Sequence, residues 1–427
     1  MIPELRTLLL QIVVVCAVAR ALGWLFARLH QPRVIGEIVA GILLGPSLLG
    51  WLSPRTLAFI FPAQGLGALY SLSQVGLLLF MFQVGLELDV DRLRRMGRVV
   101  VLTSNISILV PFLAGAGLAL FLYPRLSSAS VRVSDFALFM GTAMSITAFP
   151  VLARILAERK MLQSKVGSIA ISCAAVDDIT AWCLLAILIV RVRSSMGTAL
   201  WFTLGGLIIY VAFMILVLRP LLLRSQAFKK QKVSTDTLAF VLLLTFLSAW
   251  TTEWLGVHAL FGAFFAGVML PRSEGLIRSF VEKLKTLNTV LLLPLFFAFT
   301  GLRTSVGLLT GETLWFYCAL IVLVAIAGKL LGCVVSVRSA GMDWREAFSV
   351  GVLMNTRGLI ELVILNVGLD LGVISPTLFS MMVIMALITT LMTTPLLDLM
   401  ARSGGAGELA SLSAPPTVAS RQGHSIS

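Results

Sequence analysis

The chain has 427 residues, of which 58% are hydrophobic and only 12% are charged, and its formal net charge is +13. Soluble domains carry about 25% charged residues, so the composition excludes a soluble protein and favours an all-α protein that crosses a membrane many times. The positive charge is better explained by basic cytoplasmic loops than by nucleic-acid binding.

Thirteen apolar segments follow one another along the chain and predict membrane spans. Of the 33 Lys and Arg residues, 23 fall at span ends and loops of one side, 7 fall on the other side, and three lie within spans. Because basic residues accumulate in the cytoplasm, we predict a multi-pass protein of the cell membrane with its N-terminus outside and its C-terminus in the cytoplasm. The predicted spans are 7–28, 34–50, 66–88, 99–122, 136–156, 166–192, 199–223, 237–256, 258–271, 288–302, 313–337, 346–367 and 377–400.

Three pairs of short segments resemble each other in the same order along the two halves of the chain. They relate the second span to the ninth, so the halves would have opposite orientations in the membrane. Such inverted repeats are typical of secondary transporters, whose binding sites lie near the bilayer midplane. Chance similarity between Gly- and Leu-rich helices is the alternative. The pairs are IGEIVAGILLGP (35–46) with FGAFFAGVMLP (261–271), FMFQVGLEL (80–88) with FFAFTGLRT (296–304), and GTAMSITAFPVL (141–152) with GVLMNTRGLIEL (351–362).

Two adjacent carboxylates, Asp177 and Asp178, lie in the middle of the sixth apolar span. Ionisable residues inside a membrane are rare and usually mark an ion pathway. Adjacent helical residues do not share one face, so one partner cannot serve both aspartates. Lys329, the one charge between residues 313 and 337, is also costly to bury without a partner. We therefore predict that Lys329 pairs with one aspartate and that the other holds a proton or a monovalent metal cation in turn.

Three further charges within spans each have two interpretations. Arg357 and Glu361 are spaced i, i+4 and either neutralise each other on one helix face or contact the substrate. Glu37 either pairs with Arg33 at the membrane interface or contributes to the ion pathway. We treat all three as supporting charges of the candidate site.

Two spans contain polar residues and helix breakers at matching places. Ser145, Thr147 and Pro150 interrupt the fifth span, and Asn355 and Thr356 interrupt the twelfth. Proline removes a backbone donor and frees a carbonyl, and discontinuous helices expose such groups to a central cavity. We predict two broken helices that contact the ion; a simple kink relieved by Ser and Thr hydroxyls is the alternative.

Four motifs resemble one family closely: RVIGEIVAGILLGPSLLG, SITAFPVLARIL, AAVDDITAW and MNTRGLIELVILNVGLDLGVIS. They are similar to the monovalent cation–proton antiporters of the second superfamily branch, which includes plant cation/H+ exchangers, Kef-type potassium systems and bacterial Na+/H+ antiporters. The resemblance covers about residues 5–400. By position, Asp178 resembles the essential ion-carrying aspartate of the family. Asp177 resembles the neighbouring aspartate, which pairs with a lysine, and Lys329 resembles this lysine.

The resemblance implies a homodimer with a mobile core, two crossed broken helices and elevator-like alternating access. It favours a secondary antiporter of Na+ or K+ against H+, electrogenic if two aspartates and a lysine move more than one proton per cation. An ion-coupled transporter of an organic solute and a gated channel or sensor are the alternatives. We expect no enzyme activity, no cofactor beyond the transported ions and no nucleotide-binding regulatory domain of the Kef type. The expected parts are a transmembrane exchanger domain (1–402), with core spans in 99–192 and 313–400, scaffold spans in 7–88 and 237–302 and a linker at 199–223, and a disordered cytoplasmic tail (403–427).

Overall fold

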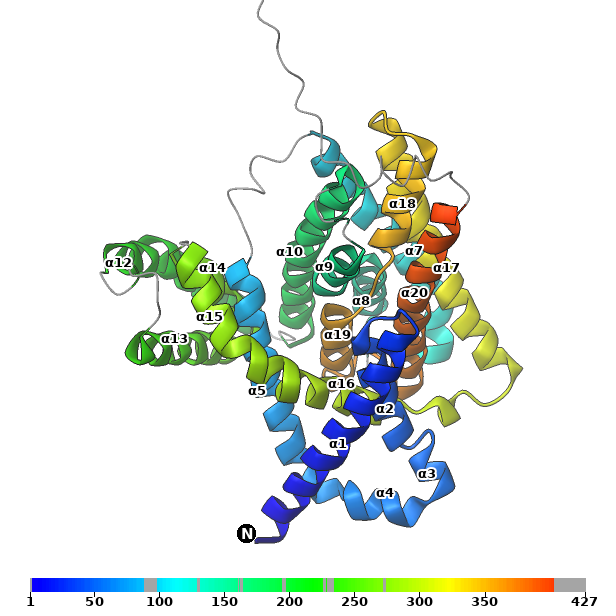
Figure 1. Cartoon of the computed structure of the whole chain (residues 1–427), viewed down its shortest axis with the longest axis horizontal. Helices are drawn as coiled ribbons and strands as arrows, with labels where there is room; N and C mark the ends of the chain where they lie inside the picture. The colour runs from blue at the N-terminus through cyan, green and yellow to red at the C-terminus, as the bar shows by residue number, and fades with distance from the viewer. Residues whose placement is uncertain are drawn as a thin grey trace, which may run out of the picture.

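The computed structural model describes residues 2–87, 98–128, 131–159, 161, 164–193, 197–225, 228, 234–271 and 274–402, and within these ranges the ordered elements are all helical (Figure 1). The tail predicted to be disordered, 403–427, lies outside the described residues. The helices are α1 (Ile2–Arg28), α2 (Arg33–Leu44), α3 (Leu49–Leu52), α4 (Pro54–Ile60), η1 (Ala63–Gly65), α5 (Leu66–Glu87), α7 (Arg98–Leu126), α8 (Val133–Ser145), α9 (Phe149–Glu158), α10 (Lys165–Arg193), α11 (Gly197–Phe213), η2 (Met214–Leu218), α12 (Arg219–Arg224), α13 (Thr235–Trp254), α14 (Ala259–Met269), α15 (Glu274–Leu287), η4 (Asn288–Leu292), α16 (Leu293–Leu302), η5 (Val306–Leu308), α17 (Glu312–Ser339), α18 (Trp344–Met354), α19 (Leu359–Asp370) and α20 (Pro376–Arg402).

Ten helical segments of the described chain are long and apolar enough to cross a membrane, and each coincides with one of the thirteen predicted spans. An eleventh span is made by α18 and α19 together if their 44° bend is counted as one broken crossing. The predicted ninth span corresponds to the shorter apolar helix α14, and the predicted fifth span to α8 followed by α9. The multi-pass membrane class is therefore established, while the count of thirteen stays a prediction.

The helices form two packed groups. In the first, α7 packs against α8 and α17, α17 packs against α18 and α20, and α10 contacts α7, α8, α9 and α18. In the second, α2 packs against α1 and α16, and α5 packs against α14 and α16. Figure 1 shows α12 to α15 lying to one side of the first group. The division into core and scaffold spans, and their relative motion, stay predictions.

One continuous buried apolar cluster joins the two groups. Leu77 and Phe296 enter it from the second group, and Phe139 and Ile364 enter it from the first. All four side chains are at most 1% exposed. Burial of apolar area in this cluster holds the groups together without a directional bond between them, which leaves polar contacts to set their register.

The breaks in the two interrupted spans have local causes. Helix α8 ends at Ser145, and α9 begins at Phe149 with Pro150 as its second residue, where a missing N–H costs no helical hydrogen bond. Between α18 and α19, a Cβ atom on Gly358 would lie 2.6 Å from the Val151 side chain. Glycine is therefore required there because α9 passes too close for any side chain.

Candidate functional site

The two breaks cross each other at the centre of the first helix group. The Ala148 N–H donates to the Thr356 carbonyl at 2.9 Å, and the Thr147 hydroxyl donates to the Met354 carbonyl at 2.7 Å. Ala148, Thr147 and Thr356 are 0% exposed. Each broken helix therefore satisfies orphan backbone groups of the other, as buried backbone requires. The interruption is a built crossing of two extended segments and more than a kink.

The hydroxyls predicted to contact the ion are mostly used within the protein. The Ser145 hydroxyl donates to the Thr142 carbonyl at 2.9 Å, and the Thr356 hydroxyl donates to the Leu353 carbonyl at 2.7 Å. Since both serve as donors to their own helices, their oxygens keep acceptor capacity only. The crossing can therefore offer oxygen acceptors, which is what a cation needs.

Lys329 forms a buried ion pair with Asp177. Its Nζ lies 2.6 Å from Asp177 Oδ2, and both side chains are 0% exposed. The same ammonium donates to the backbone carbonyls of Ser145 at 2.5 Å and Ser107 at 3.0 Å. An ammonium has three donors, so all three are satisfied. The residue pattern left open which of the two aspartates pairs with Lys329, and the structure shows that it is Asp177.

Ser107 is a member of this cluster that the sequence reasoning missed. Its hydroxyl also lies 3.4 Å from Asp177 Oδ1, so it contacts both members of the ion pair from α7. A sequence signal was present, because Thr103, Ser104 and Ser107 recur at helical spacing in an apolar span. All three are at most 1% exposed.

Asp178 has the opposite environment to its neighbour. Its side chain is 3% exposed, and neither carboxylate oxygen has a hydrogen-bond partner. The backbone N–H of Phe149 at the start of α9 lies nearby without meeting hydrogen-bond geometry. Buried carboxylates without a partner are costly. A proton or a cation on Asp178 would remove that cost.

Arg357 and Glu361 contact each other and the end of α8. Arg357 Nη1 lies 3.2 Å from Glu361 Oε1, and both side chains are 0% exposed. The guanidinium also donates to the carbonyls of Ala143 and Met144, each at 2.7 Å. A cation at a helix C-terminus is favourable because the last carbonyls carry partial negative charge. The observed contacts therefore match the first of the two interpretations, a structural pair that closes the end of α8.

Asn355 and Glu37 lie in different surroundings. Asn355 is 2% exposed and its Oδ1 has no partner, so it adds a second orphan acceptor at the crossing. Glu37 on α2 is half-buried, and no ion pair joins it to Arg33 within the described residues. It lines a cavity of about 500 Å³ together with Gln83 of α5 and Phe149. The backbone of Phe149 also lies near Asp178, so the cavity ends in the neighbourhood of that carboxylate.

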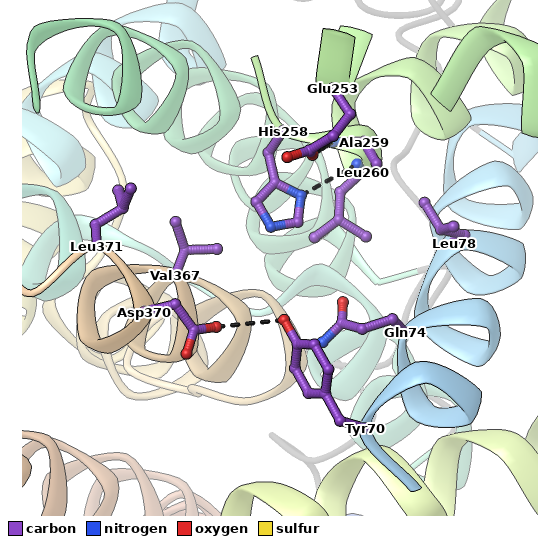
Figure 2. A pocket seen from close by; sticks show the side chains of 10 residues that line it. All are labelled: Tyr70, Gln74, Leu78, Glu253, His258, Ala259, Leu260, Val367, Asp370 and Leu371. Carbon is purple, nitrogen blue, oxygen red and sulfur yellow. Dashed lines mark hydrogen bonds between the residues drawn. The ribbon is translucent and has the colours of Figure 1, made fainter. Parts of the chain in front are cut away.

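A second cavity, of about 290 Å³, lies at the other ends of the same helices. Figure 2 shows Tyr70 of α5 pointing toward Asp370 of α19, with His258 facing them from the start of α14. The Tyr70 hydroxyl donates to Asp370 Oδ2 at 3.4 Å, and His258 Nδ1 accepts the N–H of Leu260 at 3.4 Å. Helices α5 and α19 thus line both cavities, one on each side of the crossing.

Comparisons with known proteins place the chain among ion exchangers. A profile of the sodium/hydrogen exchanger family, transmembrane part, matches residues 13–399. The chain is 48% identical over 396 residues to the Na(+)/H(+) antiporter NhaS4 of Synechocystis sp., covering 92% of this chain and 96% of that protein. It is 41% identical to Cation/H(+) antiporter 17 of Arabidopsis thaliana and 33% identical to K(+)/H(+) antiporter 1 of Saccharomyces cerevisiae, covering 92% and 88% of this chain. It spans only 48% and 44% of those two longer proteins.

The fold is also shared with a solved structure. The sodium proton antiporter MjNhaP1 of Methanocaldococcus jannaschii superposes with a TM-score of 0.64, covering 95% of this chain and 98% of that one. Only 15% of the aligned residues are identical, so this likeness concerns the fold alone.

Proposed function

Because this chain belongs to the sodium/hydrogen exchanger family, we propose that it exchanges Na+ or K+ for H+ across a membrane and that Asp178 holds the two ions in turn. The observation that carries this role is the pair of buried Asp178 oxygens without a partner. A carboxylate in that state gains from either ion, so the two ions compete for it. Competition for one group couples the two fluxes.

The neighbouring pair supplies the second part of the mechanism. Asp177 holds Lys329 while Asp178 is protonated, releases it when a cation enters, and reclaims it when the cation leaves. Ser145 and Ser107 carbonyls position the ammonium between these steps, and the Asn355 oxygen adds a ligand for the cation. If Lys329 loses its proton on release, each cycle moves more than one proton per cation and is electrogenic.

The two cavities support alternating access of the ion site to the two sides of the membrane. In the proposed cycle, the helix group with the crossing moves as an elevator against the group with α2, α5 and α14, and the two cavities open in turn. The resembling segments of the two halves would then form inverted repeats. We further propose a homodimer in the cell or plasma membrane, with the N-terminus outside and the C-terminus in the cytoplasm.

Cavity size does not separate cation exchange from transport of an organic solute. The cavity of about 500 Å³ beside Phe149 exceeds the needs of a hydrated ion. Family membership favours cation exchange.

Purified protein in sealed vesicles tests the proposal directly. Addition of Na+ or K+ should collapse a trapped pH gradient in the wild type. Asp178→Asn should abolish this response, because an amide neither ionises nor exchanges a proton. Glu312→Gln, a change of the same kind at an exposed position on α17, is the matched control and should respond like the wild type. An undiminished response in Asp178→Asn would contradict the mechanism; repeating the assay with the membrane potential clamped and then free measures electrogenicity.

A further inference from the structure

A third cavity, of about 400 Å³, lies between the turn that joins α1 to α2 and the ends of α9 and α20. His30 and Arg33 line it from the turn, Arg159 from α9, and Asp398 from α20. Gln31 ties the turn to α20 by donating to the Leu391 carbonyl at 3.3 Å. The cavity therefore bridges the two helix groups at a place that the proposed exchange does not use.

His30 occupies a backbone position that suits glycine. The His30 N–H donates to the Ala27 carbonyl at 3.1 Å, and the Gln31 N–H donates to the Phe26 carbonyl at 2.9 Å. This pattern closes a helix with a left-handed residue, usually Gly. His30 has φ 57°, and it is the one non-glycine residue with positive φ in the described chain. An imidazole is thus held at the cavity against the local backbone preference.

Arg33 also opposes a local rule. It is the first residue of α2, and a positive charge at a helix N-terminus is unfavourable. It is exposed and forms no ion pair within the described residues. Arg159 is already paired with Asp398 at 2.8 Å, so the spare positive charge of the cavity comes from the turn. Two locally unfavourable residues that line one cavity indicate a function there.

The surface beside the cavity is apolar and carries interfacial residues. Trp24 and Leu25 near the end of α1 are 52% and 42% exposed, and Leu29 in the turn that follows is 60% exposed. The Arg28 guanidinium lies 3.7 Å from the centre of the Trp24 ring. Trp with Arg is typical of a membrane interface, where apolar stems contact acyl chains and charges reach the headgroups. An anionic headgroup in the cavity would leave its acyl chains against this surface.

We propose that this cavity binds the phosphate of an anionic phospholipid from the leaflet at this end of α1, which the predicted orientation makes cytoplasmic. Donors from His30 and Arg33 receive the phosphate, as basic pockets between membrane helices do. The bound lipid joins the α1–α2 turn to α9 and α20, and so stabilises one arrangement of the two helix groups.

Thermal unfolding of the full chain in micelles tests this site. Phosphatidylglycerol should raise the melting temperature of the wild type above its value in phosphatidylcholine of the same chain length. His30→Gly with Arg33→Gln should lose that difference. The double variant should still fold. Gly adopts a left-handed backbone conformation without strain, and removing a positive charge from a helix N-terminus is favourable. Arg55→Gln, which removes an exposed arginine of α4, is the control and should keep the full lipid effect.

Three results would overturn the site. They are an undiminished phosphatidylglycerol effect in the double variant, an equal loss in Arg55→Gln, and an equal stabilisation of the wild type by inorganic phosphate, which would indicate a soluble anion. Arg33→Gln alone keeps the test decisive if the double variant unfolds, since it should lose most of the lipid effect by itself.

Discussion

At the scale of single residues, the two adjacent aspartates have opposite surroundings. Lys329 and Ser107 satisfy Asp177, while the oxygens of Asp178 have no partner. Breaking a buried ion pair leaves an uncompensated charge, which is far more costly than removing both partners. The pair should therefore be sensitive to loss of one member and tolerant of loss of both.

We expect Lys329→Met to lower the free energy of unfolding by about 3–5 kcal/mol, because Asp177 is then buried alone. Lys329→Met with Asp177→Leu should recover a large part of this loss. The pair of Lys165 and Glu346 is 51% and 24% exposed, so the control Lys165→Met should change stability by no more than about 1 kcal/mol. Thermal unfolding in detergent measures all three variants.

A double variant no more stable than Lys329→Met would show that Asp177 is not the charge that Lys329 compensates. If Lys329→Met and Lys165→Met lowered the free energy of unfolding equally, burial of the Lys329–Asp177 pair would have no influence on stability.

Much of this cluster is predictable from sequence, and the remainder has a physical reason for being hidden. The rarity of charges in apolar spans identifies Asp177, Asp178 and Lys329. It does not select which aspartate Lys329 contacts, because that depends on the rotation of α10 against α17. Ser107 and Ser145 reach the lysine through backbone carbonyls. Every residue has a carbonyl, so composition carries no sign of such contacts.

At the scale of helices, two crossings rest on glycines. A Cβ on Gly41 would lie 2.2 Å from the Ala298 carbonyl oxygen, and one on Gly301 would lie 2.5 Å from the Ile38 carbonyl oxygen, so α2 and α16 touch backbone to backbone. The same holds between α5 and α14. A Cβ on Gly85 would lie 2.0 Å from the Phe264 carbonyl oxygen, and one on Gly267 would lie 2.2 Å from the Phe82 carbonyl oxygen.

The positions of these glycines bear on the proposed repeats. Gly41 and Gly267 occupy matching places in the first pair of resembling segments, and Gly85 and Gly301 in the second. The crossing of α2 with α16 is therefore the counterpart of the crossing of α14 with α5. The two-repeat interpretation stays a prediction, and this correspondence supports it. The spacing of small residues was visible in the sequence, whereas the identity of the partner helix was not, because it depends on long-range packing.

We expect Gly267→Ala and Gly301→Ala each to destabilise the protein by about 1–3 kcal/mol, because a methyl group overpacks a backbone contact. Gly117→Ala on α7 is the matched control, since nothing lies within 4 Å of its added Cβ. There the helix propensity of Ala should raise stability by up to about 1 kcal/mol. Melting temperatures and the monodisperse fraction after gel filtration report the difference. Similar melting temperatures for Gly267→Ala and Gly117→Ala would disprove the close crossing.

At the scale of the whole molecule, polar contacts fasten the two helix groups beside the cavity of Figure 2. Arg303, at the end of α16, lies 2.6 Å from Asp370 Oδ1 and donates to Asn366 Oδ1 at 2.9 Å. Tyr70 reaches Asp370 from α5, and Asn366 donates to the Thr300 hydroxyl at 2.9 Å. If the groups move during exchange, these contacts must separate.

We expect Arg303→Gln to favour the state in which this side is open. The pair is partly exposed, 24% and 40%, so the gain should be roughly 1 kcal/mol, or about fivefold in population. A Gln74→Cys variant, with the five native cysteines replaced, should react that much faster with an impermeant thiol reagent when Arg303→Gln is added. Adding Arg55→Gln instead should leave the rate unchanged. A labelling rate that does not respond to Arg303→Gln would show that the contacts do not hold this side closed.

The buried charged side chains have a net charge that depends on what Asp178 holds. Within the described residues, five charged side chains are 3% exposed or less: Asp177, Asp178, Lys329, Arg357 and Glu361. With both pairs formed and Asp178 empty, their sum is one negative charge, which is penalised in a low-dielectric interior. A proton or a monovalent cation on Asp178 brings the sum to zero. In the proposed cycle, the loaded protein would therefore change sides more readily than the empty one, which would suppress uncoupled leak. Net charge would move in that cycle only if Lys329 itself gave up a proton.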